Sequence, residues 1–181
     1  MSLRRVLIFV VGGILLAGII HITVVLLVPS FATRNAWTTM VALGPERTFH
    51  ALPTTGEGGF TKPDPFMLLA ACRFSVASAP VRIQAHLPDD FWSVAVFDRR
   101  GLNLYSLNDR AADRSELDLI LVTPLEMARL RADPPVSFDT AIVVELPLDE
   151  GFALLRVFVS DPSRRPAAEA ALASANCSGP L

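Results

Sequence analysis

The feature that most constrains this chain is an uninterrupted apolar segment near its N-terminus. Residues 6–28 read VLIFVVGGILLAGIIHITVVLLV, a stretch of 23 residues without a fixed charge that directly follows Arg4 and Arg5. As an α-helix rising about 1.5 Å per residue, this segment would be roughly 35 Å long, enough to cross a hydrocarbon layer of about 30 Å. The sequence therefore predicts a transmembrane helix over residues 6–28.

Charges beside the segment predict its orientation. Arg4 and Arg5 precede it, whereas only Arg34 follows it at short distance. Because basic residues are retained preferentially on the cytoplasmic side, we expect residues 1–5 in the cytoplasm and the remainder of the chain in the periplasm. Lys62 is the single lysine among 16 basic residues, a bias typical of GC-rich bacterial genomes. The sequence thus predicts a single-pass protein of a bacterial inner membrane, with the lipid bilayer as its first partner.

A cleaved signal peptide is the alternative to a permanent anchor. Ser30 and Ala32 are small residues that could precede a cleavage site. However, the apolar region of a cleavable signal usually has only about 7–15 residues. We therefore favour an uncleaved signal anchor.

His21 is the single ionisable residue within the apolar segment. Ionisable residues at membrane depth often have a function, and the small residues Gly13 and Ala17, one helical turn apart, let a second helix approach closely. The simpler interpretation is a neutral imidazole that reaches the interface or a neighbouring helix. We favour this interpretation and keep helix pairing, including homo-oligomerisation, as the alternative.

The remaining chain has room for one ordinary domain, because domains usually comprise about 100–150 residues and the whole chain has 181. The 16 basic and 18 acidic residues of the whole chain form no run of like charge. Nucleic-acid binding requires a basic surface, so we do not expect a nucleic-acid partner.

Residues 29–66 are expected to be a juxtamembrane segment and linker. Pro29 should end the transmembrane helix, and residues 35–41 should form a short amphipathic piece with Trp37 at the membrane surface. The stretch LPTTGEGGFTKPDP that follows is rich in Gly, Thr and Pro, as is typical of a flexible connection.

Residues 67–181 are expected to form a periplasmic β domain. Short apolar runs, most of them alternating on at least one face, predict strands over residues 72–77, 81–87, 91–97, 102–107, 117–122, 141–146 and 152–159. Such regularly spaced strands are typical of a mainly antiparallel sandwich or barrel. Two helices interrupt them: Thr123 to Glu126 is a capping box that starts a helix ending near Ala132, and a second, C-terminal helix spans residues 162–175.

The chain contains two cysteines, Cys72 in the first predicted strand and Cys177 near the C-terminus. In an oxidising compartment the simplest outcome is one disulfide, which would tie the C-terminal helix to the sheet. Two buried thiols or an intermolecular bridge remain the alternatives. Metal binding is not expected, because no Cys or His lies nearby at ligand spacing.

The sequence offers no catalytic motif. It contains neither Gly-x-Ser-x-Gly nor Cys-x-x-Cys, and its histidines have no His-Glu-x-x-His spacing. The acidic pairs Asp89-Asp90 and Asp149-Glu150 flank predicted strands, as turn residues do. We therefore expect no cofactor and favour a protein that is not an enzyme.

The densest polar cluster is VFDRRGLNLYSLNDR, residues 96–110. Asp98 and Gly101 occupy the first and fourth positions of a predicted type I turn, which explains the charged first half as a β-hairpin. Tyr105, Asn108 and Arg110 are not explained by the turn. They could close one end of a sheet by hydrogen bonds, which we favour, or face a ligand.

The chain also resembles the short, membrane-anchored bacterial members of the domain of unknown function 1254 family. The residues that carry the resemblance are Cys72-Arg73-Phe74, Pro80, Phe91-Trp92-Ser93, Phe97-Asp98-Arg99-x-Gly101, Tyr105, Asn108-Asp109-Arg110, Pro134-Pro135 and Glu150-Gly151-Phe152. The resemblance implies a single-span protein that accompanies a partner carrying the domain of unknown function 1214, since longer exported members contain both domains. This chain lacks the Asn-x-Asp-Thr-like stretch of the long members, so no ligand site carries over from them. The family name implies no reaction.

Two hypotheses for function follow. In the favoured one, the periplasmic β domain binds another envelope protein. In the alternative, the domain binds or converts a small molecule with a polar cluster of Arg73, Trp92, Tyr105, Asn108 and Arg110. The two differ in whether these five side chains converge on one pocket.

Overall fold

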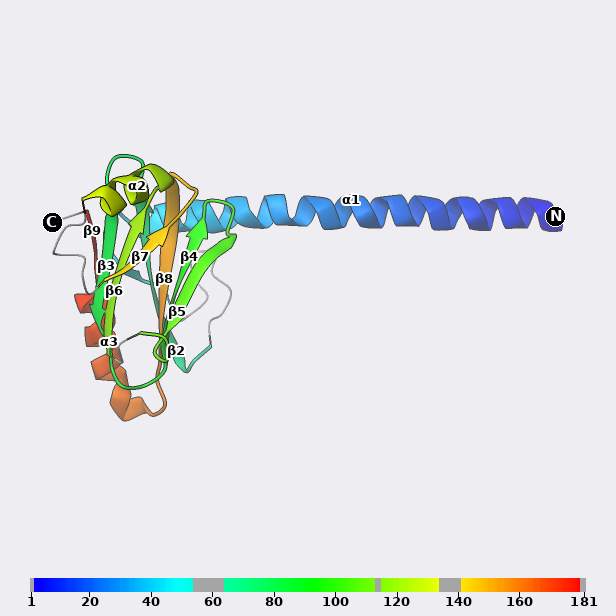
Figure 1. Cartoon of the computed structure of the whole chain (residues 1–181). Coiled ribbons are helices and arrows are strands. Elements are labelled where there is room, and N and C mark those ends of the chain that lie inside the picture. Colours follow the sequence, from blue (N-terminus) through cyan, green and yellow to red (C-terminus); the bar gives the residue numbers. More distant parts are fainter. Residues whose placement is uncertain (1, 54–63, 113–114, 134–140, 180–181) are drawn as a thin grey trace.

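A long N-terminal helix leads into a β-sandwich in the computed structural model, which describes residues 2–53, 64–112, 115–133 and 141–179, with the backbone alone for residues 29–36 (Figure 1). The helices are α1 (Leu3–Leu43), α2 (Pro124–Ala132), the 3₁₀ turn η2 (Pro162–Arg164) and α3 (Arg165–Ser174). The strands are β1 (His50–Ala51), β2 (Met67–Ser75), β3 (Val81–His86), β4 (Trp92–Asp98), β5 (Asn103–Asn108), β6 (Glu116–Val122), β7 (Ile142–Glu145), β8 (Glu150–Phe158) and β9 (Asn176–Ser178).

The strands form two sheets, one of five strands in the order β1-β2-β8-β4-β5 and one of four in the order β7-β6-β3-β9. Every pairing is antiparallel except that of β6 with β7, which is parallel. No strand pairing among the described residues joins the two sheets into a closed barrel. Of the two predicted architectures, a sandwich or a barrel, the fold is therefore a sandwich.

The core lies between the two sheets and follows directly from the alternation of the strands. Leu117, Leu119 and Leu121 of β6 point inward and are almost completely buried, as their period of two requires. Phe74 of β2 and Trp92 of β4 supply the largest aromatic side chains from the opposite sheet. Burial of these apolar faces is the main driving force for folding of the domain.

Most predicted elements are found within one or two residues of their predicted bounds, but three features differ. β2 begins at Met67, five residues before the predicted start, and pairs with β8 along its whole length. The short strands β1 and β9 were not predicted, because two or three residues carry no periodicity. The predicted linker lies mostly in residues 54–63, outside the described part of the chain.

The prediction that Pro29 ends the first helix is wrong, because α1 continues without interruption to Leu43. Its 41 residues correspond to a rod of about 60 Å. Proline inside a helix costs about 3 kcal/mol, and contacts of the last turns with the sandwich stabilise the continuation. Residues 35–41 are thus the end of one helix rather than a separate amphipathic piece.

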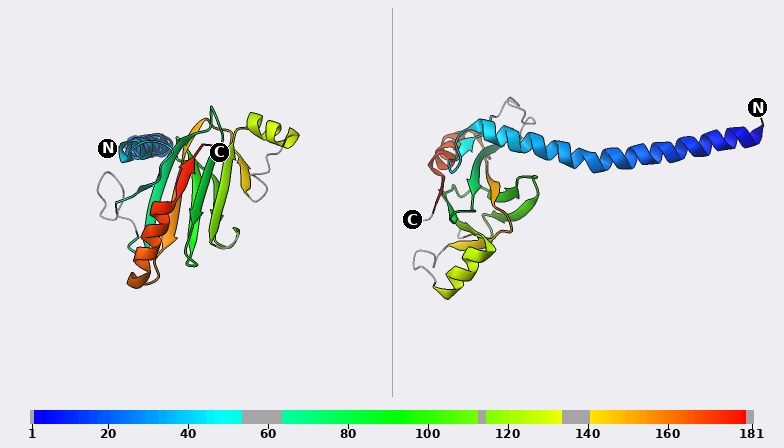
Figure 2. Two further views of the ribbon diagram at one scale, coloured as in Figure 1. Left: turned by 90° about the vertical axis from the view of Figure 1, so that its left-hand side faces the viewer. Right: turned by 90° about the horizontal axis from the view of Figure 1, so that it is seen from above.

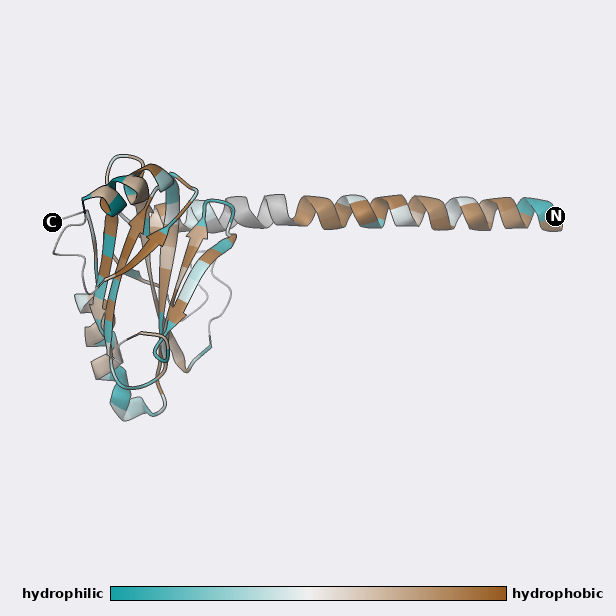
Figure 3. Ribbon diagram, in the orientation of Figure 1, coloured by the Kyte–Doolittle hydropathy of each residue, from teal (hydrophilic) through white to brown (hydrophobic). Residues whose placement is uncertain are grey.

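The first part of α1 is long and apolar enough to cross a membrane. Leu3–Val28 has a mean hydropathy of 2.6, and none of it is buried against the rest of the protein. Figure 3 shows the apolar residues along this part of the rod, well separated from the sandwich. His21 lies on it, fully outside the folded domain.

The predicted disulfide between Cys72 and Cys177 is present, and it joins the two sheets. Cys72 of β2 and Cys177 of β9 are both completely buried, and their Cα atoms are 6.5 Å apart. The short strand β9 pairs with β3, with Cys177 opposite Ile83. The preceding helix α3 buries Ala168, Ala171 and Leu172 against the core. The disulfide therefore fixes the C-terminal segment over one side of the sandwich.

Candidate functional site

The five polar residues of the predicted ligand cluster do not converge. Trp92 is fully buried and Tyr105 is half-buried, both on the inner side of the five-stranded sheet. Arg73 and Asn108 lie on its outer side, opposite Phe152 and Ser93 respectively. The Asn108 side-chain oxygen accepts a hydrogen bond from the Arg110 backbone N–H at 3.1 Å, which closes the turn after β5. Two faces of one sheet therefore separate these residues.

The charged half of the same stretch is a hairpin turn, as predicted. Gly101 donates its N–H to the Asp98 carbonyl at 3.0 Å and has a φ of 80°, which glycine adopts without strain. The Asp98 carboxylate accepts the backbone N–H groups of Arg100 and Leu102, each at 2.8 Å. Asp98 is thus engaged in holding the turn that joins β4 to β5.

The end of α1 packs on the outer face of the five-stranded sheet, at a contact here called the helix–sheet joint. Met40 is buried against Ala71 and Phe152, with Trp37 and Leu43 at the margin. These contacts form a second hydrophobic cluster, separate from the core between the sheets. The membrane-type helix and the sandwich are therefore connected by a packed interface.

An arginine from the β4–β5 turn strengthens this joint. The Arg99 guanidinium lies 5.0 Å from the centre of the Trp37 ring, a cation–π contact. The same guanidinium forms an ion pair with Glu150 of β8 at 3.1 Å. The turn is therefore held against the helix at the level of Trp37.

The C-terminus of α1 is closed by Arg73, one of the predicted site residues. Its Nη2 donates to the Gly44 carbonyl at 2.8 Å, satisfying a helix-end acceptor. Gly44 has a φ of 149°, and a Cβ added there would meet the His50 ring at 2.5 Å. The His50 Nε2 lies 2.9 Å from the Pro45 carbonyl oxygen. Arg73 therefore has a structural role at the joint.

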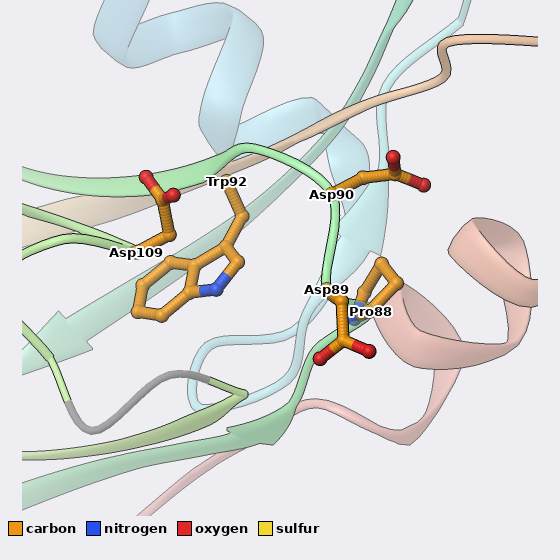
Figure 4. A pocket seen from close by; sticks show the side chains of 5 residues that line it. All are labelled: Pro88, Asp89, Asp90, Trp92 and Asp109. Carbon is orange, nitrogen blue, oxygen red and sulfur yellow. The ribbon is translucent and has the colours of Figure 1, made fainter.

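A hollow of about 240 Å³ lies beside Trp92 and is lined by Pro88, Asp89, Asp90 and Asp109. Figure 4 shows the Asp109 carboxylate over one side of the indole, with Asp89 and Asp90 on the loop beyond its other side and pointing away from it. Asp90 already faces Arg164 at 3.8 Å and Ser160 at 3.3 Å. The three carboxylates do not point toward one common position. Among the described residues, no group of three potential ligands could hold a metal ion.

A second hollow, of about 320 Å³, lies on the outer face of the five-stranded sheet, away from the helix–sheet joint. It is lined by Met67, Phe91, Ser93, Ser106, Leu107, Asn108, Ala111 and Arg156. The Nε atom of Arg156 is buried there and has no hydrogen-bond partner among the described residues. An arginine in such a setting can bind an anionic group.

A third cavity, of about 510 Å³, lies between α3 and the edge formed by β1 and β2. Its walls are mainly apolar and include Phe49, Leu68 and Leu172, with Arg165 and Glu169 as the charged residues. These two side chains are 3.4 Å apart and neutralise each other. This cavity was not predicted from the sequence, because its walls come from three segments that are far apart in the chain.

One buried ion pair was also missed. Arg82 donates to both carboxylate oxygens of Asp118, Nε to Oδ1 at 2.8 Å and Nη2 to Oδ2 at 2.6 Å. These hydrogen bonds raise the pKa of Arg82, against the opposing effect of its burial. The pair links β3 to β6 on the outer face of the four-stranded sheet, and its register could be inferred only after the strands were paired.

Comparison with known proteins identifies the domain. A family model described as protein of unknown function (DUF1254) matches residues 45–178. The chain belongs to this DUF1254 family. The matched residues begin directly after α1 and include both cysteines of the disulfide. No curated protein shows significant sequence similarity to the chain.

Two solved structures are similar to this DUF1254 protein. One is the VPA0106 protein from Vibrio parahaemolyticus, with a TM-score of 0.58 and 14% identity over 82% of this chain. The other is an uncharacterised protein from Burkholderia cenocepacia, with a TM-score of 0.42 and 18% identity over 62% of this chain. The chain spans 37% of the Vibrio protein and 32% of the Burkholderia protein. The Vibrio structure shares the fold of the sandwich.

Proposed function

We propose that this DUF1254 protein is a single-pass protein of a bacterial inner membrane whose periplasmic β domain binds another envelope protein. The observation that carries the proposal is that the polar residues of the predicted ligand cluster do not converge on one pocket, since Arg73 caps α1 and Asn108 closes the turn after β5. The chain spans 37% of the Vibrio protein with the same fold. A protein carrying the domain of unknown function 1214 is the candidate partner.

The anchoring part of the proposal rests on α1. Its apolar stretch Leu3–Val28 contains Arg4 and Arg5 at the N-terminal end, the arrangement expected when the N-terminus stays in the cytoplasm. The Cys72–Cys177 disulfide is consistent with export, because such bonds persist in oxidising compartments.

A binding module is favoured over an enzyme because the polar residues have structural partners. Arg73 caps α1, Asp98 holds the hairpin and Asn108 closes the turn after β5. Trp92 packs in the core. A binding partner therefore meets the outside of the sandwich rather than a pocket made by these side chains.

Copurification tests the proposal. The full chain, tagged at its C-terminus, is expressed at native level and purified from membranes in mild detergent. We expect one envelope protein in stoichiometric amount. The control is a fusion of residues 1–44 to an unrelated exported domain, which keeps α1 and lacks the sandwich. Recovery of the tagged protein alone, or equal recovery of the partner with the control, would count against binding by the β domain.

Small-molecule binding is the second candidate function, and the cavity beside α3 is the observation that favours it. Its mainly apolar walls suit an elongated apolar ligand. Native mass spectrometry of the full chain from membranes tests this function: a bound molecule lost in a Leu172→Arg variant supports it, and an empty native protein opposes it.

A further inference from the structure

We propose that an extended segment of the partner protein adds to β5 as a further strand of the five-stranded sheet. The contact is made by the backbone groups of Ser106 and Asn108 that point away from β4, here called the β5 edge. This inference deepens the proposed function: it rests on the proposed binding of an envelope partner and names the place and the mode of that binding.

The other side of the sandwich is closed by the chain itself. The edge of β2 is covered by β1 and by the segment before it, where Arg47 donates its N–H to the Arg73 carbonyl at 2.7 Å. Thr48 of the same segment forms a β-bridge with Asn176 of β9. The disulfide joins β2 to β9 on this side. A further strand therefore meets occupied backbone groups here.

The opposite side ends in β5 and β7, the last strands of the two sheets. β7 has four residues and ends with the charged Glu145, whereas β5 has six residues without a charge or a proline. Proteins usually protect exposed edges by short strands, charges, proline, bulges or a covering segment. The bulge opposite Phe97 protects only the hairpin end of β5. β5 is therefore the least protected edge strand among those that the structure describes.

The direction of the backbone groups in β5 follows from its pairing with β4. Asp109, directly after β5, donates its N–H to the Trp92 carbonyl at 3.2 Å. Because alternate residues of an antiparallel strand face the same neighbour, Leu107 turns its backbone groups to β4, and Ser106 and Asn108 turn theirs outward. Within the described parts of the chain, the two outward N–H groups and the Ser106 carbonyl have no hydrogen-bond partner.

The groups of the β5 edge fit another extended strand, which offers donors and acceptors at the same spacing. Tyr105 of β5 and Ile142 and Val144 of β7 are partly buried at the margin of the core. Alternate side chains of an added strand would point toward this margin, because successive side chains of a strand face opposite sides. We therefore expect apolar residues at alternate positions of the partner segment.

The direction of α1 favours a different protein over a second copy of this chain. Figures 1 and 2 show α1 leaving the sandwich on the side of β5, in the direction that leads from β8 to β5. Two copies paired along β5 would be related by a half-turn about an axis perpendicular to the sheet. This half-turn would send their α1 helices to opposite sides, so both helices could not span one membrane in the proposed orientation.

A proline substitution tests the β5 edge. Ser106→Pro removes an outward N–H and keeps the hydrogen bonds to β4, a position at which edge strands tolerate proline. Ser106→Ala is the matched variant, because it removes the hydroxyl and keeps the N–H. The tagged full chain is purified from membranes in mild detergent, and the copurified partner is quantified. We expect Ser106→Pro to lower the ratio of partner to chain about ten-fold, the effect of a lost hydrogen bond and an unpaired acceptor, and Ser106→Ala to retain it. An equal ratio in Ser106→Pro and the unsubstituted chain would overturn the proposal.

Hydrogen exchange of the unsubstituted chain gives a test that does not depend on the folding of the proline variant. The Ser106 amide should exchange at least about ten-fold more slowly in the complex than in the chain expressed alone, and the Leu125 amide at the start of α2 should not change. A complex with unchanged exchange at Ser106 would refute the β5 edge and leave partner binding intact. Purification without any partner would refute both proposals. Copurification of two differently tagged copies with a protected Ser106 amide would refute the assignment of the edge to a different protein.

Discussion

Replacing Met40 by alanine should release the end of α1 from the sandwich without unfolding the domain. The Met40 side chain is only 7% exposed and packs on Ala71 and Phe152 in a cluster outside the main core. Truncation of a buried methionine to alanine costs about 2–5 kcal/mol. Because this cluster lies at the surface and can partly close around the gap, we expect a value near 2 kcal/mol, a roughly 30-fold change in the docking equilibrium.

Hydrogen exchange of the full chain in detergent measures this equilibrium. Amides in the last turn of α1 should exchange roughly 30-fold faster in Met40→Ala, whereas those of β8 should keep their protection. Val41→Ala is the matched control, since Val41 is the next residue of the same helix and is 46% exposed. Surface substitutions of this kind change stability by less than about 0.5 kcal/mol.

Two results would refute the reasoning on the helix–sheet joint. Equal exchange in Met40→Ala and Val41→Ala would mean that the packed cluster does not hold α1. Equal loss of protection in α1 and in β8 would mean that Met40 belongs to the cooperative core of the domain.

Three further predictions concern stability of the β domain. Cys72→Ala with Cys177→Ala should lower the free energy of unfolding by about 4–5 kcal/mol in the loop-entropy model, measured by urea titration, since 105 positions separate the two residues. Gly44→Ala should weaken the helix–sheet joint, because an imidazole occupies the site of the new Cβ; unchanged exchange at the end of α1 would contradict this. The hydrogen bonds from Ser163 lower the pKa of Asp161, so this carboxylate stabilises the fold above its unfolded pKa of about 3.8, and the effect is lost as pH falls through the folded pKa. The stability of the Asp161→Asn variant, measured by denaturant unfolding at a series of acidic pH values, should not show this loss.

Periodicity, capping residues and turn residues were sufficient to predict the elements whose geometry depends on neighbouring residues in the sequence. The alternation of Leu117, Leu119 and Leu121 predicted β6, and the Thr123 capping box predicted α2, where Glu126 N–H bonds to the Thr123 hydroxyl at 3.3 Å. The hairpin at Asp98 followed from its turn residues in the same way.

Features that depend on long-range contacts were not predicted. α1 continues past Pro29 because its last turns pack on a sheet whose strands lie much later in the sequence. The parallel direction of β7 depends on the path of the connection before it, which periodicity does not record. The proposed ligand cluster failed for a similar reason: Trp92 and Asn108 are assigned to opposite faces only by the register of β4 and β5.

All functional conclusions depend on α1 spanning the membrane with the β domain on the exported side. Fusion of alkaline phosphatase after Leu181 tests this directly, because the enzyme folds into its active form only outside the cytoplasm. The account predicts an active reporter that remains with the membrane fraction. An inactive reporter at normal expression level would contradict the orientation, and an active reporter released from the membrane would contradict the anchor.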